Sequence, residues 1–376
     1  MKISNLEANK ILNSRGNWTV QVKVTLEDGS TAVASVPEGL SKGTTEAFYL
    51  TPDESVEVIN SKLSVQLKNL DVSDLELFDQ KLIDLDGTEN KSNLGANSTL
   101  AISIACARAF ANSQKIELYE YLNRFIPVQI GSRFPEFMVL VIEGGKHADN
   151  QLLIQEFLAV VETVEEGLDI YHKVSEEIGK LGYSTNVGAE GAVSPTQILS
   201  EEAVNIIEKF HDKISFKISL DVAASSVPEA EKELLHLLVN HKFFSIEDPF
   251  PETSWDKWTK FLVEHPTQIL VADDIVTTNP ELIRKGVENH IANAVIIKPN
   301  QIGTITEAIR AVNVARSAGW KIICSHRGGE TIDDFIADFA VAVVSDYVKF
   351  GGFNRGERIA KYNRMLEIKR KLDLLK

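Results

Sequence analysis

The sequence predicts an α/β protein in which a small α+β domain precedes a larger barrel built from β/α units. Three observations support this fold class. The 376 residues exceed what one hydrophobic core usually organises, so two domains are expected. The first third of the chain alternates apolar and polar residues like antiparallel strands and then becomes helical. The rest repeats a short apolar strand and a helix, within a composition typical of globular proteins.

Charge and cysteine content restrict the classes of partner and the compartment. Asp and Glu number 54 against 39 Lys and Arg, and the net charge of −15 repels nucleic-acid phosphates, so no nucleic-acid partner is expected. Cys106 and Cys324 are too few for a disulfide framework and indicate a reducing compartment. There is no signal-peptide pattern, and the most apolar stretch, residues 100–111, is too short to span a bilayer. We therefore expect a cytoplasmic protein without a transmembrane segment.

The predicted N-terminal domain covers residues 1–126 and begins with strands. Residues 3–36 are strand-like, and Asp28-Gly29 supplies a hairpin turn between two apolar alternating runs. Helical patterns follow at residues 53–70, 73–85, 95–113 and 118–125. The third of these is apolar nearly all round, which predicts a buried helix. Strands followed by helices indicate an α+β domain, and residues 126–135 are the predicted linker.

The predicted barrel covers residues 134–376, where short apolar strands end in charged residues at intervals of 23–28 residues. These strand ends are Asp221, Glu247-Asp248, Asp273-Asp274, Lys298, His326-Arg327 and Lys349. The interval accommodates one strand, one helix and two loops. No glycine-rich nucleotide fingerprint opens a helix, which favours a barrel over a doubly wound sheet. Because functional side chains lie at the C-terminal ends of barrel strands, these residues are predicted to converge on one polar site.

Three of the strand ends would bring carboxylates together, namely Asp221, Glu247 and Asp273. Without a partner they would repel one another, and the pKa of each would rise. A divalent cation removes this conflict, and all-oxygen ligation favours a hard ion such as Mg²⁺. The alternative is a set of salt bridges between neighbouring strand ends, for which Lys298 and Lys349 are available.

The remaining strand ends point to proton abstraction beside a carboxylate. Lys298, next to a metal and a second lysine, would have its ammonium form disfavoured and could act as a general base. The guanidinium of Arg327, next to His326, suits a phosphate or a carboxylate. The charge of the resulting enediolate would be held by the metal.

Two segments ahead of the repeat add further candidates. GGKHADNQLLIQEF contains His147, Gln155 and Glu156, and VGAEGAVSP contains Glu190. A lone histidine or glutamate in a loop is more often a surface residue. However, a carboxyl group buried near another carboxyl group keeps its proton and becomes a competent acid.

The whole chain resembles the enolase family. KILNSRGNWTVQVKVTLEDG and NLGANSTLAISIACARAFA are similar to family segments. They are followed, in the family's order, by GGKHADN, IQEF, VGAEG, SLDVAAS, SIEDPF, VADDIVTTNP, IIKPNQIGT, SHRGGET and RIAKYN. The resemblance implies an N-terminal α+β cap and a modified (β/α)₈ barrel of the TIM type, with rearranged early strands and helices. It also implies a Mg²⁺-dependent glycolytic lyase, phosphopyruvate hydratase, that interconverts 2-phosphoglycerate and phosphoenolpyruvate and forms a dimer or larger homo-oligomer.

The roles implied by the resemblance fall on the residues already selected. Lys298 would be the base at C2, and Glu190, supported by Glu156, the acid that assists loss of the C3 hydroxyl. The expected catalytic residues are Lys298, Glu190, Glu156 and His147. The expected substrate-binding residues are Gln155, His326, Arg327 and Lys349, of which Lys349 would bind the substrate carboxylate. The expected ligands of the tightly bound Mg²⁺ are Asp221, Glu247 and Asp273.

The chain departs from the family pattern mainly in loops. Glu38 stands where the family has a serine that contributes to a second Mg²⁺, so Glu38 is a candidate ligand of that ion. Other departures are Lys42 in the same loop, Gly328 after the phosphate-binding arginine, Ala189 beside Glu190 and Glu143 before the GGKH loop. Two segments, one after AFYL and one between residues 224 and 243, are shortened.

Two other functions stay open. One is a paralogue with weak or altered activity that serves mainly as a binding or surface protein for host proteins, with a cell-surface or secreted fraction. The other is an enzyme that acts on a related 2-hydroxy acid. The joint presence of Lys298, Glu190 and Lys349 favours the hydratase over both.

Overall fold

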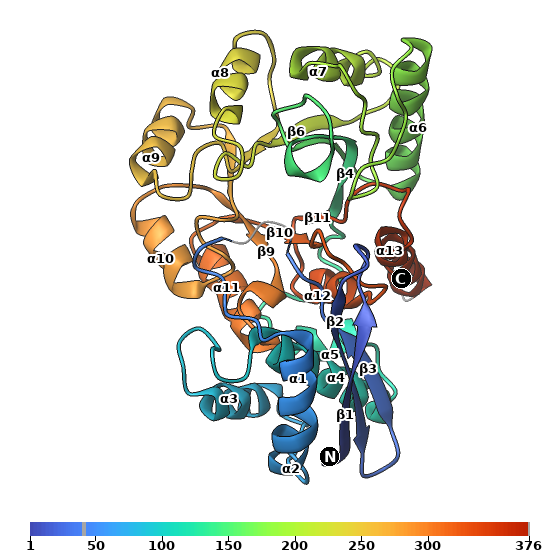
Figure 1. Ribbon diagram of the computed structural model, residues 1–376, viewed down its shortest axis with the longest axis vertical. Helices are drawn as coiled ribbons and strands as arrows, with labels where there is room; N and C mark the ends of the chain where they lie inside the picture. The colour runs from blue at the N-terminus through green and yellow to red at the C-terminus, as the bar shows by residue number, and fades with distance from the viewer. Residues whose placement is uncertain (40–42, 375–376) are drawn as a thin grey trace.

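The computed structural model describes residues 1–39 and 43–374 (Figure 1). A small sheet with its helices lies at the bottom of Figure 1, and a closed eight-stranded barrel surrounded by helices lies above it. This arrangement confirms the predicted fold class. Residues 124–135, which include the predicted linker, contain no helix or strand. The division into residues 1–126 and 134–376 stays a prediction.

The N-terminal sheet is antiparallel, in the order β1-β2-β3. Its strands are β1 (Ile3–Leu12), β2 (Trp18–Leu26) and β3 (Thr31–Ser35). The predicted turn joins β2 to β3: Gly29 has φ 86° and donates its N–H to the Leu26 carbonyl oxygen at 3.0 Å. A positive φ is readily adopted by glycine, which explains the Asp28-Gly29 signal.

Helical segments follow this sheet in the chain, and the longest of them packs against it. They are α1 (Pro52–Val58), the π-helical turn η1 (Ile59–Leu63), α2 (Ser64–Gln66), α3 (Leu75–Asp86), α4 (Ala96–Gln114) and α5 (Leu118–Asn123). Thr51 and Glu54 form a reciprocal capping box at the start of α1, and Asp74 caps α3. The helix α4, packed against β2 and β3, is buried along most of its length, as its all-round apolar pattern predicts.

The barrel closes in the order β10-β11-β4-β5-β6-β7-β8-β9. Its strands are β4 (Glu136–Glu143), β5 (Glu156–Val161), β6 (Lys217–Asp221), β7 (Ser245–Glu247), β8 (Ile269–Ala272), β9 (Ala294–Ile297), β10 (Lys321–Ser325) and β11 (Tyr347–Lys349). Its helices are α6 (Val164–Lys180), α7 (Ser200–Glu208), α8 (Ala230–Asn240), α9 (Trp255–Glu264), α10 (Pro280–Glu288), α11 (Ile305–Ser317), α12 (Phe335–Ala342) and α13 (Gly356–Leu374). Short 3₁₀ turns, η2 (Gly145–His147) and η3 (Pro299–Gln301), follow β4 and β9.

The early part of the barrel is rearranged, as the resemblance implies. No α-helix separates β4 from β5, and α6 and α7 follow one another between β5 and β6. In consequence β5 runs antiparallel to both of its neighbours, whereas the other strand pairs are parallel. The N-terminal end of β5, which begins at Glu156, therefore lies at the same rim as the C-terminal ends of the other strands.

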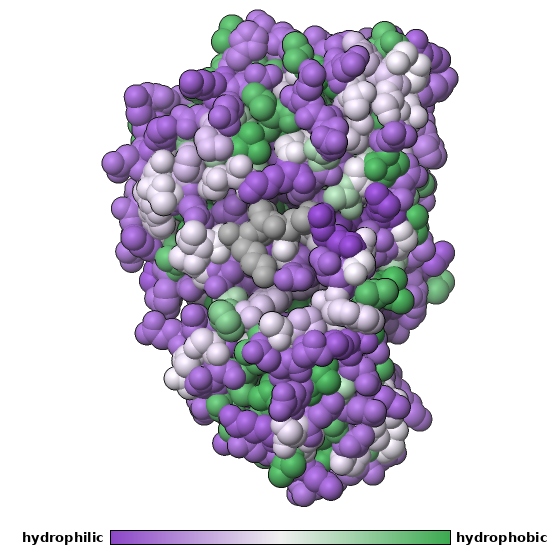
Figure 2. Space-filling model, in the orientation of Figure 1, coloured by the Kyte–Doolittle hydropathy of each residue, from purple (hydrophilic) through white to green (hydrophobic). Residues whose placement is uncertain are grey.

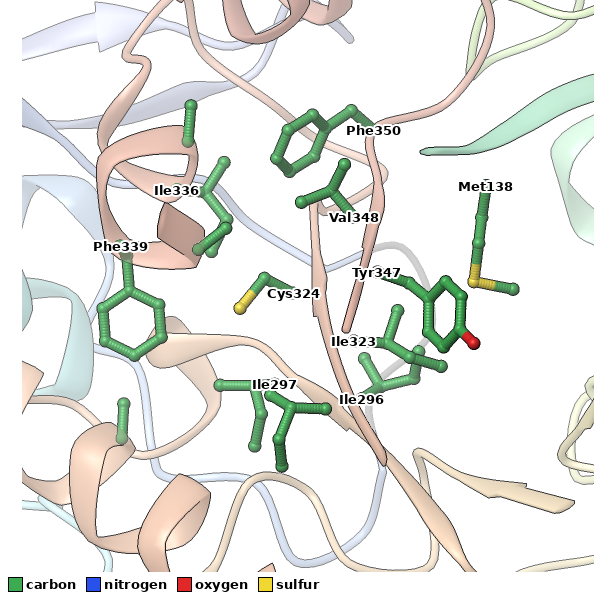
Figure 3. Packing of buried hydrophobic residues seen from close by; sticks show 14 of the residues in the cluster. Met138, Ile296, Ile297, Ile323, Cys324, Ile336, Phe339, Tyr347, Val348 and Phe350 are labelled. Carbon is green, nitrogen blue, oxygen red and sulfur yellow. The ribbon is translucent and has the colours of Figure 1, made fainter. Parts of the chain in front are cut away.

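Apolar side chains fill both faces of the barrel strands. Figure 3 shows Cys324 on the side of β10 that faces Ile336 and Phe339 of α12, while Ile323 and Tyr347 lie on the opposite side. Alternation along the strand produces this division. Both cysteines are free and buried, and burial raises the pKa of Cys324 to about 12, so its thiol is unreactive.

The outer surface of the described part shows no extended apolar area on the face seen in Figure 2, where hydrophilic residues predominate and hydrophobic ones form small separate groups. Within residues 1–39 and 43–374, no helix combines the length and the apolar character needed to cross a membrane.

Candidate active site

The predicted residues meet in a pocket at the rim of the barrel, which encloses about 460 Å³ including its open mouth. Its lining includes His147, Gln155, Glu156, Glu190, Asp221, Asp273, Lys298, His326, Arg327 and Lys349. Each of these is a residue selected from the sequence. Glu247 is not part of the lining but lies 2.8 Å from Lys349 Nζ. Glu38 does not line the pocket either.

The strand register places four carboxylates in one row across the rim. Glu143 is paired with Glu156, Glu156 with Asp221, and Asp221 with Glu247. Asp273 directly follows β8, the next strand. The charged strand ends therefore converge as expected, and the antiparallel β5 adds Glu156 to the row.

A buried lysine lies among these carboxylates. Lys349 Nζ is 2.9 Å from Glu156, 3.0 Å from Asp221 and 2.8 Å from Glu247. Burial lowers the pKa of Lys349, but the surrounding carboxylates raise it by more than burial lowers it. The pKa of Lys349 therefore lies well above the ordinary lysine value. Burial also raises the pKa of Glu247 well above its usual range. The salt bridges considered as an alternative from the sequence are thus present.

The second buried lysine is paired with the third strand-end carboxylate. Lys298 Nζ donates to Asp273 Oδ2, and the other oxygen of Asp273 accepts from Gln301 at 3.3 Å. Burial lowers the pKa of Lys298, but Asp273 raises it more, so the net direction is upward. This upward direction applies without a bound metal, whereas the lowered pKa expected from the sequence refers to Lys298 beside Mg²⁺.

Glu190 lies between two imidazoles. Its Oε2 is 3.0 Å from His326 Nε2 and 3.6 Å from His147 Nδ1. Burial raises the pKa of Glu190, but the two histidines and Arg358 lower it more, so its pKa lies well below its ordinary value. Burial raises the pKa of Glu156, and here the net direction is upward. The pKa directions of Glu190 and Glu156 are thus opposite in this arrangement.

Sequence reasoning missed the partner of Arg327. The guanidinium contacts Glu46 twice, Nη2 to Oε1 at 2.8 Å and Nη1 to Oε2 at 3.2 Å, and both side chains are buried. Glu46 belongs to the segment after β3, far from the barrel in sequence. Its location in the same loop as Glu38 was the only signal that could have identified it.

The same loop is tied to the barrel through its backbone. Glu38 and Gly329 exchange two hydrogen bonds of 2.8 Å, so the chain after β3 pairs with the segment after β10 near the centre of Figure 1. Lys42, the other departure noted in this loop, lies outside the described residues. The loop therefore contacts the pocket residue Arg327 through the side chain of Glu46, and it pairs with Gly329 through the backbone of Glu38.

Buried groups of α13 support the segment that carries His326 and Arg327. Arg358 donates to the carbonyl oxygens of Arg327 at 2.6 Å and Gly328 at 3.0 Å. Lys361 Nζ lies 3.0 Å from Glu330, whose carboxylate accepts the N–H of Arg327 at 3.1 Å. These interactions account for the RIAKYN motif, whose role could not be assigned from the sequence.

Two clusters of described residues could hold a cation, with ligand atoms within 4.8 Å of one another: Asp248, Asp273 and Asp274, and His147, Glu156 and Glu190. Only Asp273 belongs to the predicted ligand trio. Asp248 has a structural function as well, because its carboxylate accepts the N–H groups of Asp273 and Asp274, each at 3.0 Å. Burial and the charge of Asp273 raise the pKa of Asp274 to about 7.

Comparison with known proteins identifies the relatives of this chain. The family model of the enolase N-terminal domain matches residues 3–122, and that of the enolase C-terminal TIM barrel domain matches residues 132–241 and 226–374. A curated enolase from Campylobacter lari is 39% identical over 403 aligned positions, which cover 97% of this chain and 96% of that protein. The alignment exceeds the 376 residues of the chain and so contains gaps, in line with the predicted shortened segments. The chain therefore belongs to the enolase family and is a lyase, a phosphopyruvate hydratase.

Proposed function

We propose that this enzyme interconverts 2-phosphoglycerate and phosphoenolpyruvate in glycolysis, with Mg²⁺ and with the pocket residues in the roles the resemblance implies. The observation that carries the proposal is the convergence of a carboxylate row, two buried lysines, the Glu190–His326 pair and the Arg327 guanidinium on one pocket. A homo-oligomer in the cytoplasm is part of the same proposal.

The donor set fits a divalent cation. Asp221, Glu247 and Asp273 provide carboxylate oxygens, and Glu247 Oε1 is buried without a hydrogen-bond partner among the described residues. We assign the tightly bound Mg²⁺ to these three side chains. When bound, the ion would stabilise the enediolate charge and neutralise the carboxylates that now pair with Lys298 and Lys349.

The proposed reaction divides proton transfer between two residues. Lys298, in its neutral amine form, takes the proton from C2 of 2-phosphoglycerate, and the electron pair left on C2 forms the double bond to C3 as the hydroxyl leaves. Glu190 supplies the proton that converts this hydroxyl into water, and Glu156 and His147 hold the proton near Glu190. Atoms balance, since the products are phosphoenolpyruvate and one water molecule.

The remaining pocket residues bind the anionic ends of the substrate. Arg327 and His326 bind the phosphate end of the substrate, and Lys349 binds its carboxylate. Gln155, whose Nε2 lies 3.5 Å from Asp221, approaches the substrate beside the metal ligands. Glu38 is the candidate contributor to a second Mg²⁺.

The test follows phosphoenolpyruvate formation by ultraviolet absorbance, with Mg²⁺ and with a chelator, in the native protein and in Lys298→Ala. Formation that requires both Mg²⁺ and Lys298 supports the proposal. No formation by a correctly folded native protein at saturating Mg²⁺ would overturn it, and the same assay with related 2-hydroxy acids then tests that alternative.

A further inference from the structure

A glutamate outside the predicted catalytic set makes unusual contacts next to Glu190. Glu143 is the last residue of β4 and is fully buried. Its two carboxylate oxygens each accept a backbone N–H of the following glycine-rich loop, from Glu190 at 2.9 Å and from Ala192 at 3.0 Å. One side chain therefore binds the peptide groups on both sides of Gly191.

The fit around this carboxylate is tight. A Cβ added at Gly188 would lie 2.5 Å from Glu143 Oε1, so position 188 has no room for a side chain while Glu143 keeps its place. The backbone N–H of Glu143 also donates to the Val193 carbonyl oxygen at 3.0 Å. The loop of residues 188–193 is thus attached to the end of β4 by one residue at three points.

The opposite side of the loop is also held. The carbonyl oxygen of Glu190 accepts the N–H of Gly352 at 2.9 Å, beyond the end of β11. With its backbone fixed from both sides, Glu190 directs its carboxylate toward His326 at 3.0 Å and His147 at 3.6 Å. A shift of the loop would change both distances.

We propose that Glu143 is a positioning residue that holds the Glu190 carboxylate in its catalytic place by accepting the N–H groups of Glu190 and Ala192. The inference rests on the proposed function, in which Glu190 is the acid and Lys298 the base. Glu143 does not touch the substrate in this scheme and acts only through the loop. Its removal therefore impairs the step that needs Glu190 more than the step that needs Lys298.

The variant Glu143→Gln provides the sharpest test, because the shape is kept while one acceptor oxygen is replaced by an NH₂ group that faces a backbone N–H. Displacement of a catalytic group by about 1 Å can slow a reaction about 100-fold. We expect kcat for dehydration to fall by about 10–100-fold with little change in KM. Exchange of the C2 proton of 2-phosphoglycerate with D₂O should keep most of its rate.

Two further variants complete the test. In Gly188→Ala the added methyl group would collide with the Glu143 carboxylate and displace it. This variant should show the same loss of dehydration with C2 exchange retained, and it tests the proposal independently if Glu143→Gln does not fold. Asp346→Asn is the matched control, since this buried carboxylate accepts the Ile322 N–H at 2.9 Å at the other end of the barrel. It should leave the ratio of dehydration to exchange at the native value.

Amide hydrogen exchange separates this inference from the proposed function. Faster exchange of the Glu190 and Ala192 amides in Glu143→Gln, with native exchange elsewhere, supports the positioning contact even if the native protein does not form phosphoenolpyruvate. Equal loss of dehydration and C2 exchange, or native rates for both, would overturn the positioning role. Native exchange rates of the Glu190 and Ala192 amides in Glu143→Gln would also overturn it.

Discussion

Arg327 and Glu46 form a buried two-point ion pair, with N–O distances of 2.8 and 3.2 Å, between the barrel rim and the segment that follows the N-terminal sheet. The pair occupies the guanidinium that we assign to the substrate phosphate. Burial lowers the pKa of Arg327, but Glu46 raises it more, so the net direction is upward. The substrate phosphate and Glu46 would therefore compete for the Arg327 guanidinium.

The first prediction follows from this pair. Glu46→Gln removes the negative charge that contacts the buried Arg327 guanidinium at two points, which should lower the free energy of unfolding by about 3 kcal/mol. Inorganic phosphate should restore stability more in the variant than in the native protein, because it replaces the missing anion. Thermal unfolding with and without phosphate measures this, and equal phosphate shifts in both proteins would show that Arg327 is not the phosphate site.

The second prediction concerns the metal. Asp221→Ala, Glu247→Ala and Asp273→Ala should each weaken Mg²⁺ binding by at least about tenfold, since each removes a charged oxygen ligand. Titration calorimetry measures the affinity, and circular dichroism verifies the fold. Native Mg²⁺ affinity in all three folded variants contradicts the assignment.

The third prediction separates the acid from the base. Lys298→Ala should abolish both dehydration and exchange of the C2 proton, whereas Glu190→Gln should stop dehydration and leave measurable exchange. The reason is that removal of the C2 proton does not require the acid. Nuclear magnetic resonance of 2-phosphoglycerate in D₂O reports exchange, and equal loss in both variants would refute the division of roles.

The fourth prediction concerns Glu38, whose backbone is paired with Gly329 and whose side chain does not line the pocket. If Glu38 stays off the second Mg²⁺ in the working enzyme, Glu38→Ser should lower the Mg²⁺ concentration needed for half-maximal turnover, because a neutral ligand replaces a charged group outside the coordination shell. We expect this outcome. A higher requirement would instead make Glu38 a ligand, and no change would remove this residue from the second metal site.

The fifth prediction concerns the contact between the two parts of the chain. Arg108 of α4 binds Asp333 through two hydrogen bonds of 2.7 Å. Burial raises the pKa of Asp333, but Arg108 lowers it more, and the net pKa lies below the ordinary value. The stability that Asp333 contributes is therefore present above pH about 4 and is lost only as the pH falls through its lowered pKa. In Arg108→Ala the carboxylate loses the interaction that lowers its pKa, so this contribution is already absent at neutral pH and less stability is left to lose on acidification.

Urea unfolding at several pH values tests this. Arg108→Ala should lower the free energy of unfolding by about 3 kcal/mol at neutral pH, and its difference from the native protein should become smaller as the pH falls toward the pKa of Asp333. The control is Lys180→Ala, which removes an exposed ion pair with Glu176 and should leave stability close to the native value at every pH. Parallel pH profiles for the native protein and Arg108→Ala would contradict the prediction.

Local sequence patterns were sufficient for much of the fold. The Asp28-Gly29 turn, the buried helix α4 and the regular β/α repeat each depend on residues close together in the chain, so their periodicity is visible without tertiary contacts. The strand-end residues Asp221, Glu247 and Asp273 could be grouped for the same reason, since parallel strands in a barrel end at one rim.

The protonation pattern of the site could not be obtained in this way. The sequence led us to expect a protonated Glu190 and a Lys298 of lowered pKa beside a bound metal. Burial acts in the expected direction on the pKa of both groups, but the nearest charges outweigh it. The direction depends on which groups lie within a few ångströms. For Glu190 these are two histidines, and for Lys298 it is Asp273.

The sequence by itself thus determined the barrel, its polar rim and the residue types available for the chemistry. Tertiary structure decided three further points: the antiparallel direction of β5, which brings Glu156 into register with Asp221; the pairing of Glu46 with Arg327; and the attachment of the Glu190 loop to Glu143. The physical reason is common to all three. Each depends on strand register or on a contact between residues far apart in the chain, and such contacts leave no periodic signal in the sequence.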